Sequence, residues 1–335
     1  MLFETFLLTR TFDMNIVVTG SAGYVGSTLC AVLLARGHRV VGVDSLMHGG
    51  DAMLGFLSDP SFTFVRGDLR DAAVVARGVV GADAVVHLAA IVGDPACKRD
   101  PVLSRAVNYD ASMGLITAAE NAGAGRFVFA STCSNYGKMS EGEDSVDEHS
   151  PLTPLSIYAE TKVAVERHLL ESSWRDSFAP TVLRLSTVYG LSARPRFDLT
   201  VNEFAAELLQ KGELLVFGEQ FWRPYIHVRD VARGVLAVLE APASKVRGEV
   251  FNLGRDDQNY QKQTLVELIQ RRLPDTKITY VKQVSDPRDY RVRFDKIRSV
   301  LGFELEHDVE SGIDEILSAI RDGVITDTHN PRYAN

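Results

Sequence analysis

Short apolar runs alternate with longer stretches of helical periodicity through the first half of the chain. Strands are predicted at residues 15–19, 38–43, 62–65, 84–87, 126–130 and 180–185. Helical patterns separate most of them, for example at residues 25–35, 104–122 and 158–171. Because strands that alternate with helices form parallel sheets covered on both faces, the pattern predicts an α/β fold with a doubly wound parallel sheet.

The regular alternation of predicted strands and helices ends at about residue 190, and the predicted segments after it are shorter and less regular in order. Helices are expected at 202–210, 228–239, 264–272 and 309–321, with a strand at 214–216. We therefore predict a first domain over residues 14–188, which also receives a segment near 225–255, and a smaller mixed α/β domain that comprises mainly residues 189–335. Residues 1–13 are apolar but short, and are interpreted as an extension outside the fold.

Composition and charge narrow the range of partners. The chain has 335 residues, is 45% hydrophobic and carries a formal net charge of −8, which argues against nucleic acid as a partner. Its three cysteines show no metal-binding spacing, so no metal site is predicted, and they are expected to be reduced thiols in a cytoplasmic protein. No apolar run approaches the roughly 18 residues that a membrane-spanning helix needs, so no membrane partner is expected.

A glycine-rich turn joins the first predicted strand to the first helix. Gly20, Gly23 and Gly26 have the spacing GxxGxxG, in the sequence GSAGYVG. Glycine lets the backbone turn tightly and approach a ligand, and a helix N-terminus offers free N–H groups and a positive dipole end. At this place in a strand–turn–helix unit, the motif predicts a site for the diphosphate of a dinucleotide.

The ends of the next strands indicate which dinucleotide is bound. Asp44 ends the second strand, where a carboxylate can accept hydrogen bonds from ribose hydroxyls and would repel a 2′-phosphate. Ser45 and Leu46, which follow it, provide no arginine to hold that phosphate. The sequence therefore favours NAD over NADP. Asp68 and Leu69 after the third strand, and Leu88, Ala89 and Ala90 after the fourth, are predicted to border the same cofactor.

A YxxxK pair marks the candidate catalytic centre. Tyr158 and Lys162 lie four positions apart on a predicted helix and therefore share a face. Since a tyrosine has a pKa of about 10, we expect a nearby ammonium and the positive nicotinamide ring to lower it. A hydroxyl at the end of the fifth strand would relay the substrate proton. The register of that strand favours Thr132, with Ser131 as the second choice.

These motifs together resemble the extended short-chain dehydrogenase/reductases, the NAD-dependent sugar-nucleotide epimerase/dehydratase family. The resemblance runs from Met14 to about Gly323 and rests on TGSAGYVG, HLAA, STCSNYG, YAETK, RLSTVYG and RPYIHVRDVARG. It implies a Rossmann-type first domain, a smaller C-terminal domain for a sugar nucleotide, and a homodimer. It also implies catalysis by Thr132, Tyr158 and Lys162. The residues predicted to bind the cofactor are Gly20, Gly23, Tyr24, Val25, Gly26, Asp44, Asp68, Leu69, Leu88, Ala89, Ala90, Asn108, Tyr158 and Lys162.

A narrower resemblance links the stretches VGDPACKRDP, ARPRFDLTVNEF, WRPYIHVRDV and DPRDYRVRFDKI to a subgroup that includes GDP-heptose 4-dehydrogenases. Two departures from the wider family bear on the reaction. Sugar 4,6-dehydratases carry an aspartate and a glutamate directly after the threonine, whereas this chain has Cys133 and Ser134, so dehydration is not expected. Thr187 replaces an asparagine that is usual in the family.

A substrate with a diphosphate group requires cations in the second domain. The residues predicted to bind the substrate are Thr132, Thr187, Asn202, Arg223 and Arg288. The loop over residues 92–101, with Lys98 and Arg99, is interpreted either as a segment that closes over the nicotinamide and the sugar or as a solvated loop.

The predicted reaction is oxidation at C4 of a nucleotide-diphosphate sugar, with Tyr158 as the base. The same residues would serve a 4-dehydrogenase, a 4-epimerase or a reductase of 4-keto sugars, so the sequence leaves these three open, along with the nucleotide and the sugar. A non-catalytic NAD-binding sensor is a remote alternative, because such proteins can lose the tyrosine and the lysine while keeping the glycine turn.

Overall fold

The computed structural model describes residues 13–139, 142–281 and 288–335. Its larger part is a seven-stranded sheet in the order β10-β6-β5-β4-β1-β2-β3, and all neighbouring strands are parallel. The strands are β1 (Asn15–Thr19), β2 (Arg39–Asp44), β3 (Phe62–Arg66), β4 (Ala84–His87), β5 (Arg126–Thr132), β6 (Ala179–Leu185) and β10 (Glu249–Leu253). This confirms the predicted doubly wound, Rossmann-type fold.

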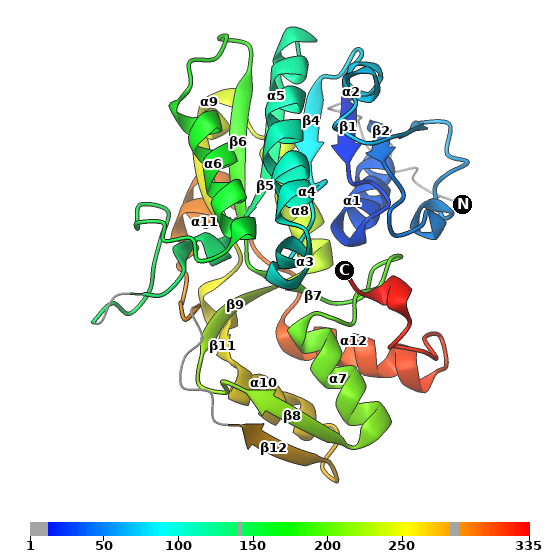
Figure 1. Cartoon of the computed structure of the whole chain (residues 1–335), viewed down its shortest axis with the longest axis vertical. Coiled ribbons are helices and arrows are strands. Elements are labelled where there is room, and N and C mark those ends of the chain that lie inside the picture. The colour runs from blue at the N-terminus through cyan, green and yellow to red at the C-terminus, as the bar shows by residue number, and fades with distance from the viewer. Residues whose placement is uncertain (1–12, 140–141, 282–287) are drawn as a thin grey trace, which may run out of the picture.

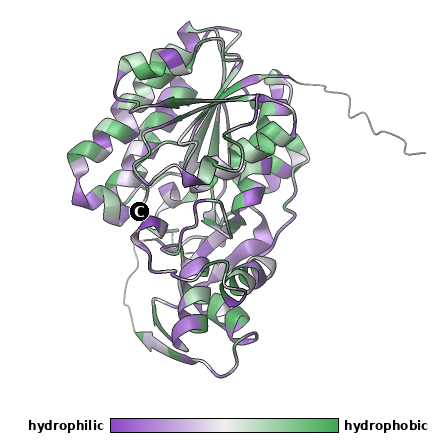
Figure 2. Cartoon of the chain, turned by 90° about the vertical axis from the view of Figure 1, so that its right-hand side faces the viewer, coloured by the Kyte–Doolittle hydropathy of each residue, from purple (hydrophilic) through white to green (hydrophobic). Residues whose placement is uncertain are grey.

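Alternation along the strands explains why helices cover both faces of this sheet. Val18 of β1 packs in one apolar cluster with Leu29 of α1 (Tyr24–Ala35) and Val231 of α8 (Val228–Glu240). Its neighbour Val17 packs in a second cluster with Leu115 of α5 (Ala111–Asn121). Because successive strand residues point to opposite faces of the sheet, Val17 and Val18 pack in two separate apolar cores. Figure 2 shows the hydrophobic strands enclosed between the two helical layers.

The helices around the sheet include two, at residues 72–78 and 295–301, that were not predicted from the sequence. On one face lie α1 (Tyr24–Ala35), α8 (Val228–Glu240) and α11 (Asp295–Leu301), and on the other lie α2 (Ala72–Gly78), α5 (Ala111–Asn121) and α6 (Ile157–Glu171). The remaining short helical segments are α3 (Asp94–Arg99), α4 (Pro101–Arg105), α9 (Ala243–Val246), η1 (Asp51–Met53), η3 (Cys133–Tyr136), η4 (Asp256–Gln258) and η5 (Pro331–Tyr333).

The smaller part of the molecule lies beyond the carboxyl ends of the sheet strands (Figure 1). It contains a three-stranded sheet of β7 (Thr187–Tyr189), β9 (Trp222–His227) and β11 (Asn259–Gln261). A second pair consists of β8 (Glu213–Phe217) and β12 (Lys277–Val281). The helices α7 (Thr200–Lys211), α10 (Lys262–Gln270) and α12 (Val309–Arg321) form an apolar core of their own around Leu265 and Ile313.

Several details differ from the sequence prediction. The helix expected at residues 104–122 consists of α4, a π-helical turn η2 (Ala106–Asp110) and α5. The expected loop at 92–101 contains α3, which begins with Asp94 and Pro95. The strands β7, β9, β10, β11 and β12 were not predicted, because polar residues interrupt their short apolar stretches. The division into two domains near residue 188 remains a prediction.

Within the described residues, none of the helices combines the length and the apolar character needed to cross a lipid bilayer. Cytoplasmic localisation remains a prediction. The predicted extension, residues 1–13, lies outside the described residues except for Asp13, which forms an ion pair with Arg39 at 3.0 Å.

Candidate functional site

A cavity of about 370 Å³ lies at the carboxyl ends of the sheet strands and is bordered on its other side by residues of the smaller part of the molecule. It brings together most of the residues predicted from sequence. The predicted residues that line it are Gly20, Gly23, Tyr24, Val25, Gly26, Asp44, Asp68, Leu69, Leu88, Ala89, Ala90, Thr132, Tyr158, Lys162, Thr187, Arg223 and Arg288.

The glycine turn forms one wall of the cavity. Gly20 has a φ of +73°, a conformation that favours glycine. A Cβ at Gly26 would lie 1.9 Å from the carbonyl oxygen of Gly20, so a side chain cannot be accommodated there. The helix α1 begins directly after the turn, at Tyr24, and its first N–H groups have no partner within the helix. Such a turn can hold a diphosphate, and diphosphate binding at Gly20, Gly23 and Gly26 stays a prediction.

Two carboxylates border the adjoining end of the cavity. Asp44 accepts hydrogen bonds from the backbone N–H groups of Ala22 at 3.0 Å and Leu46 at 2.8 Å, which fix its orientation. Each of its oxygens keeps a further lone pair for a ligand hydroxyl. Asp68 pairs with Arg70 at 2.7 Å, and this hydrogen bond lowers the pKa of the carboxyl.

A buried histidine, to which the sequence assigned no role, organises the segment after β4. His87 bonds through Nδ1 to Thr19 Oγ1 at 2.7 Å and through Nε2 to Ser112 Oγ at 2.8 Å. Burial lowers its pKa to about 3, so the ring is neutral near pH 7. Because Thr19 Oγ1 also accepts from the N–H groups of Leu88 and Ala89, its own proton points to Nδ1. The chain of bonds thus fixes the backbone that borders the cavity.

Asn108, predicted to contact the cofactor, is not among the cavity-lining residues of the described chain. It is buried in the π-helical turn η2, where its amide bonds both the N–H and the carbonyl of Ile91, at 2.8 and 2.9 Å. Ser112 also donates to the Asn108 carbonyl at 2.8 Å. Asn108 therefore holds the loop after β4 in place instead of facing the cavity.

Tyr158 and Lys162 lie on one face of α6, as predicted, and both line the cavity. The Lys162 ammonium donates to the Ala130 carbonyl at 2.7 Å and lies 5.9 Å from the centre of the Tyr158 ring. Burial lowers the pKa of Lys162 to about 8.

In the protein without a cofactor, the pKa of Tyr158 is raised, and its lowering beside a bound nicotinamide stays a prediction. Burial raises the pKa of the phenol, and the Asp94 carboxylate raises it further. The cation that opposes this rise is Arg196. Loss of water around the phenol outweighs the stabilisation of phenolate by a nearby cation.

Thr132 ends β5 at the edge of the cavity. Its Oγ1 caps η3 by accepting from the N–H of Ser134 at 3.1 Å, and it lies 2.9 Å from the Ser134 hydroxyl. Ser131, the second choice, also lines the cavity, but its hydroxyl accepts from the buried Asn135 amide at 3.0 Å. The Cys133 thiol is buried and bonds to the carbonyl of Arg184 at 3.3 Å.

The predicted substrate arginines approach from the smaller part of the molecule. Arg223, on β9, has its guanidinium carbon 5.2 Å from the centre of the Tyr290 ring. Arg288 forms an ion pair at 3.4 Å with Asp94 at the start of α3. Both arginines line the cavity together with Thr187.

Asn202 is not at the cavity, contrary to the prediction. It is buried on α7, where its amide bonds the backbone N–H and carbonyl of Gly190 at 2.9 and 3.0 Å and the carbonyl of Arg196 at 2.8 Å. These bonds hold the segment between β7 and α7. Arg194 and Arg196 of this segment do line the cavity. The two arginines belong to the stretch ARPRFDLTVNEF, which contributes to the family resemblance, but neither arginine was predicted to have a role.

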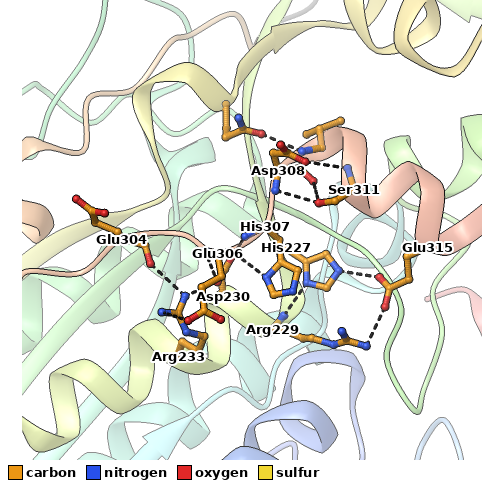
Figure 3. A network of polar contacts seen from close by, with 12 residues as sticks. His227, Arg229, Asp230, Arg233, Glu304, Glu306, His307, Asp308, Ser311 and Glu315 are labelled. Carbon is orange, nitrogen blue, oxygen red and sulfur yellow. Dashed lines mark hydrogen bonds and ion pairs between the residues drawn. The ribbon is translucent and has the colours of Figure 1, made fainter. Parts of the chain in front are cut away.

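A polar network stabilises the base of the same segment (Figure 3). His227 caps α8 and bonds to Glu315 of α12 at 2.8 Å. It stacks on His307 with ring centres 4.4 Å apart. Asp230, Glu306 and His307 have potential metal ligand atoms within 4.8 Å of one another. However, both Asp230 oxygens already accept hydrogen bonds, from Arg233 and from the backbone and ring of His307 among others, so we interpret the group as structural.

Residues 16–254 match the NAD dependent epimerase/dehydratase family. An uncharacterized UDP-glucose epimerase of Bacillus subtilis (strain 168) is 34% identical over 252 residues, which are 72% of this chain and 77% of that protein.

Two solved structures are also similar. The dTDP-glucose 4,6-dehydratase DesIV of Streptomyces venezuelae, with NAD bound, has a TM-score of 0.80 and 28% identity, and the match covers 92% of this chain and 97% of that one. A UDP-glucose 4-epimerase of Thermotoga maritima, with UDP-glucose, has a TM-score of 0.82 and 27% identity over 93% of this chain and all of that one.

Proposed function

The chain belongs to the NAD dependent epimerase/dehydratase family, and from this premise we propose that it oxidises C4 of a nucleotide-diphosphate sugar, as a 4-dehydrogenase or a 4-epimerase. One observation carries the proposal. The glycine turn and Asp44, which suit a dinucleotide, line the same cavity as Tyr158, Lys162 and Thr132, which suit proton transfer from a hydroxyl.

Tyr158 is the proposed base, which takes the proton of the C4 hydroxyl directly or through Thr132. The nicotinamide, when bound, supplies the hydride acceptor and a positive charge. Because burial raises the pKa of Tyr158, the phenolate needs cationic neighbours. Lys162 donates to the Ala130 carbonyl near the end of β5, which holds its ammonium close to the phenol. In the proposal, Lys162 would also bind a ribose hydroxyl of the cofactor.

We do not propose that the protein removes water from the sugar. Such a dehydration requires an acid and a base next to the Thr132 hydroxyl, and the two positions after Thr132 hold Cys133 and Ser134. Burial raises the pKa of the Cys133 thiol, so this residue is a poor proton donor. A reductase of 4-keto sugar nucleotides remains the alternative, because it uses the same residues in the opposite direction.

The substrate class follows from the cations opposite the catalytic face. Arg223 and Arg288 suit the diphosphate of a sugar nucleotide, since guanidinium groups bind phosphate oxygens in pairs. The similar proteins act on UDP- and dTDP-sugars by name. A GDP-heptose substrate, as the subgroup resemblance implies, stays a prediction.

Spectroscopy of the nicotinamide tests this proposal. Purified protein with NAD would receive UDP-, GDP-, dTDP- and CDP-sugars in turn, while NADH absorbance and sugar products are followed. A 4-dehydrogenase produces NADH with a 4-keto sugar, and a 4-epimerase produces an epimer with no net NADH. If the protein binds NAD but converts none of the sugars, including 4-keto sugars with NADH, the proposal fails and the sensor alternative gains support.

We also propose that the protein is a homodimer, as the family resemblance implies. Light scattering after size exclusion should give twice the 36.8 kDa mass of one chain. A mass of one chain would contradict the proposal.

A further inference from the structure

Two arginines in the cavity are not used by the mechanism above. Arg194 and Arg196 lie on the segment between β7 and α7, and both line the cavity. Arg194 is only 6% exposed, and its Nε has no hydrogen-bond partner within the described chain. One of its terminal nitrogens donates to the carbonyl of Ala334 at 2.9 Å. A buried guanidinium with an unpaired N–H is costly unless a ligand completes its hydrogen bonds.

The position of Arg194 is fixed relative to the glycine turn. The hydroxyl of Ser192 donates to the Tyr24 carbonyl at 2.7 Å and lies 3.1 Å from the Ser27 hydroxyl, both in the first turn of α1. The same Ser192 oxygen accepts from the N–H of Arg194 at 3.3 Å. A further hydrogen bond joins the same two segments, since the Tyr24 hydroxyl donates to the Gly190 carbonyl at 2.7 Å. The segment that carries the arginines is thus bonded directly to the N-terminus of α1.

The two arginines differ in their carboxylate partners. Arg196 is paired with Asp198 through two hydrogen bonds of 2.9 and 2.7 Å. Arg194 has no comparable carboxylate bond among the described contacts, and burial together with the charge of Arg196 lowers its pKa. Asp44, the other carboxylate near Arg194, is oriented by backbone N–H groups. Arg196 is therefore paired with a carboxylate, whereas Arg194 keeps a buried N–H group from which a phosphate oxygen could accept a hydrogen bond.

We propose that Arg194 and Arg196 bind the diphosphate of the dinucleotide from the side opposite the glycine turn. This rests on the NAD site of the proposed function. The N-terminus of α1 would hold one side of the diphosphate with backbone N–H groups, and the two guanidiniums would hold the other. The smaller part of the molecule would then contribute directly to cofactor binding and close the cavity over the cofactor.

The chemistry recognised is a diphosphate, and a sugar nucleotide also carries one. The arrangement favours the cofactor, because Ser192 bonds the segment to the residue that opens α1. The cations predicted for the substrate, Arg223 and Arg288, instead contact Tyr290 and Asp94.

The rest of the structure holds the arginine segment rigidly. Glu315 accepts from the N–H of Leu191 at 3.2 Å and from His227 at 2.8 Å, which joins the segment to the network of Figure 3. Gly190 has a φ of +96°, and a Cβ there would lie 2.1 Å from His227 Nε2. Asn202 holds the far end through the Arg196 carbonyl. Such preorganisation reduces the entropy lost when a ligand is bound.

Titration calorimetry with Arg194→Gln tests the proposal, with NAD, ADP, adenosine and UDP as ligands. We expect the Kd of NAD and of ADP to rise about tenfold or more, since each loses a charged hydrogen bond to phosphate. The Kd of adenosine, which has no phosphate, should change by less than about twofold. Arg194→Lys, which keeps the charge, should recover part of the loss. Arg298→Gln, an exposed arginine on α11, is the matched control and should bind all four ligands like the wild type.

Two results would overturn the inference: unchanged NAD and ADP binding in folded Arg194→Gln, or weaker UDP binding with NAD binding intact, which would assign the arginine to the substrate. Thermal unfolding verifies that the variant is folded. If it is not, Arg196→Gln takes its place under the same criteria. Failure of this inference can be distinguished from failure of the proposed function. If the wild-type protein binds NAD but converts no sugar, the proposed reaction is refuted, whereas the proposed diphosphate site is not.

Discussion

The Lys162 ammonium donates a 2.7 Å hydrogen bond to the backbone carbonyl of Ala130. This bond joins the catalytic face of α6 to the end of β5, two residues before Thr132. Ala130 and Lys162 lie 32 positions apart in the sequence, and their bond holds the end of β5, with Thr132, beside the helix that carries Tyr158.

Tyr158→Phe should abolish turnover without preventing cofactor binding. The substitution removes the oxygen that accepts the C4 proton and keeps the ring that fills the cavity wall. We expect turnover to fall by about 100-fold to 10,000-fold, the range typical for loss of a general base. The Kd of NAD should change little. Steady-state rates and calorimetry would measure the two effects, and a fully active variant would exclude Tyr158 as the base.

Lys162 should make the folded protein more stable as the pH rises from about 8 to about 10.5. Its folded pKa is lowered by burial from 10.5 to about 8, so in this window the unfolded chain keeps a proton that the folded chain has lost. The free energy of unfolding of the wild type, minus that of Lys162→Met, should therefore increase by about 3 kcal/mol across the window. Urea unfolding at a series of pH values would show this. A flat difference would mean that the lysine keeps its ordinary pKa in the fold.

Gly26→Ala should destroy the cofactor site, because the new Cβ would lie 1.9 Å from the Gly20 carbonyl oxygen. Either the turn or the start of α1 must shift, and both hold the N–H groups aimed at the diphosphate. We expect NAD affinity to fall by about 100-fold or more. Gly114→Ala on α5 is the control, since a Cβ there meets nothing within 4 Å. That variant should bind NAD normally and gain up to about 1 kcal/mol of stability. Equal NAD affinity in the two variants would contradict the assignment of the turn.

Asp44→Ser should shift the cofactor preference from NAD toward NADP. The carboxylate lies at the cavity edge, held by the N–H groups of Ala22 and Leu46, and it would repel a 2′-phosphate. Serine removes the charge and keeps a hydroxyl for a backbone N–H group. We expect the ratio of NADP to NAD dissociation constants to fall about tenfold or more. Comparison of both constants by fluorescence titration measures this, and an unchanged ratio would place the ribose elsewhere.

Arg184→Met should destabilise the fold without touching the cavity. Arg184 and Glu166 form a buried ion pair at 2.7 Å that links β6 to α6. Removal of the guanidinium leaves a buried carboxylate without its main partner, which typically costs about 3–5 kcal/mol. The double variant with Glu166→Gln removes both charges and should lose less. Urea unfolding would compare the three proteins, and a larger loss in the double variant would contradict the electrostatic account.

The sequence by itself determined the parallel sheet, the glycine turn and the Tyr158–Lys162 pair. These are local features: apolar runs define buried strands, a positive φ requires glycine at Gly20, and two residues four apart on a helix share a face. Each follows from neighbouring residues along the chain, so it can be read before the chain is folded.

Only the tertiary structure decided which polar side chains reach the cavity. Asn108 and Asn202 matched expected positions but bind backbone groups, whereas Arg194, without an assigned role, enters the cavity wall. Their surroundings come from segments far apart in the sequence, such as Ser192 against Tyr24. Burial likewise set the direction of the Tyr158 pKa, because desolvation depends on every element packed around the phenol and not on the lysine one turn away.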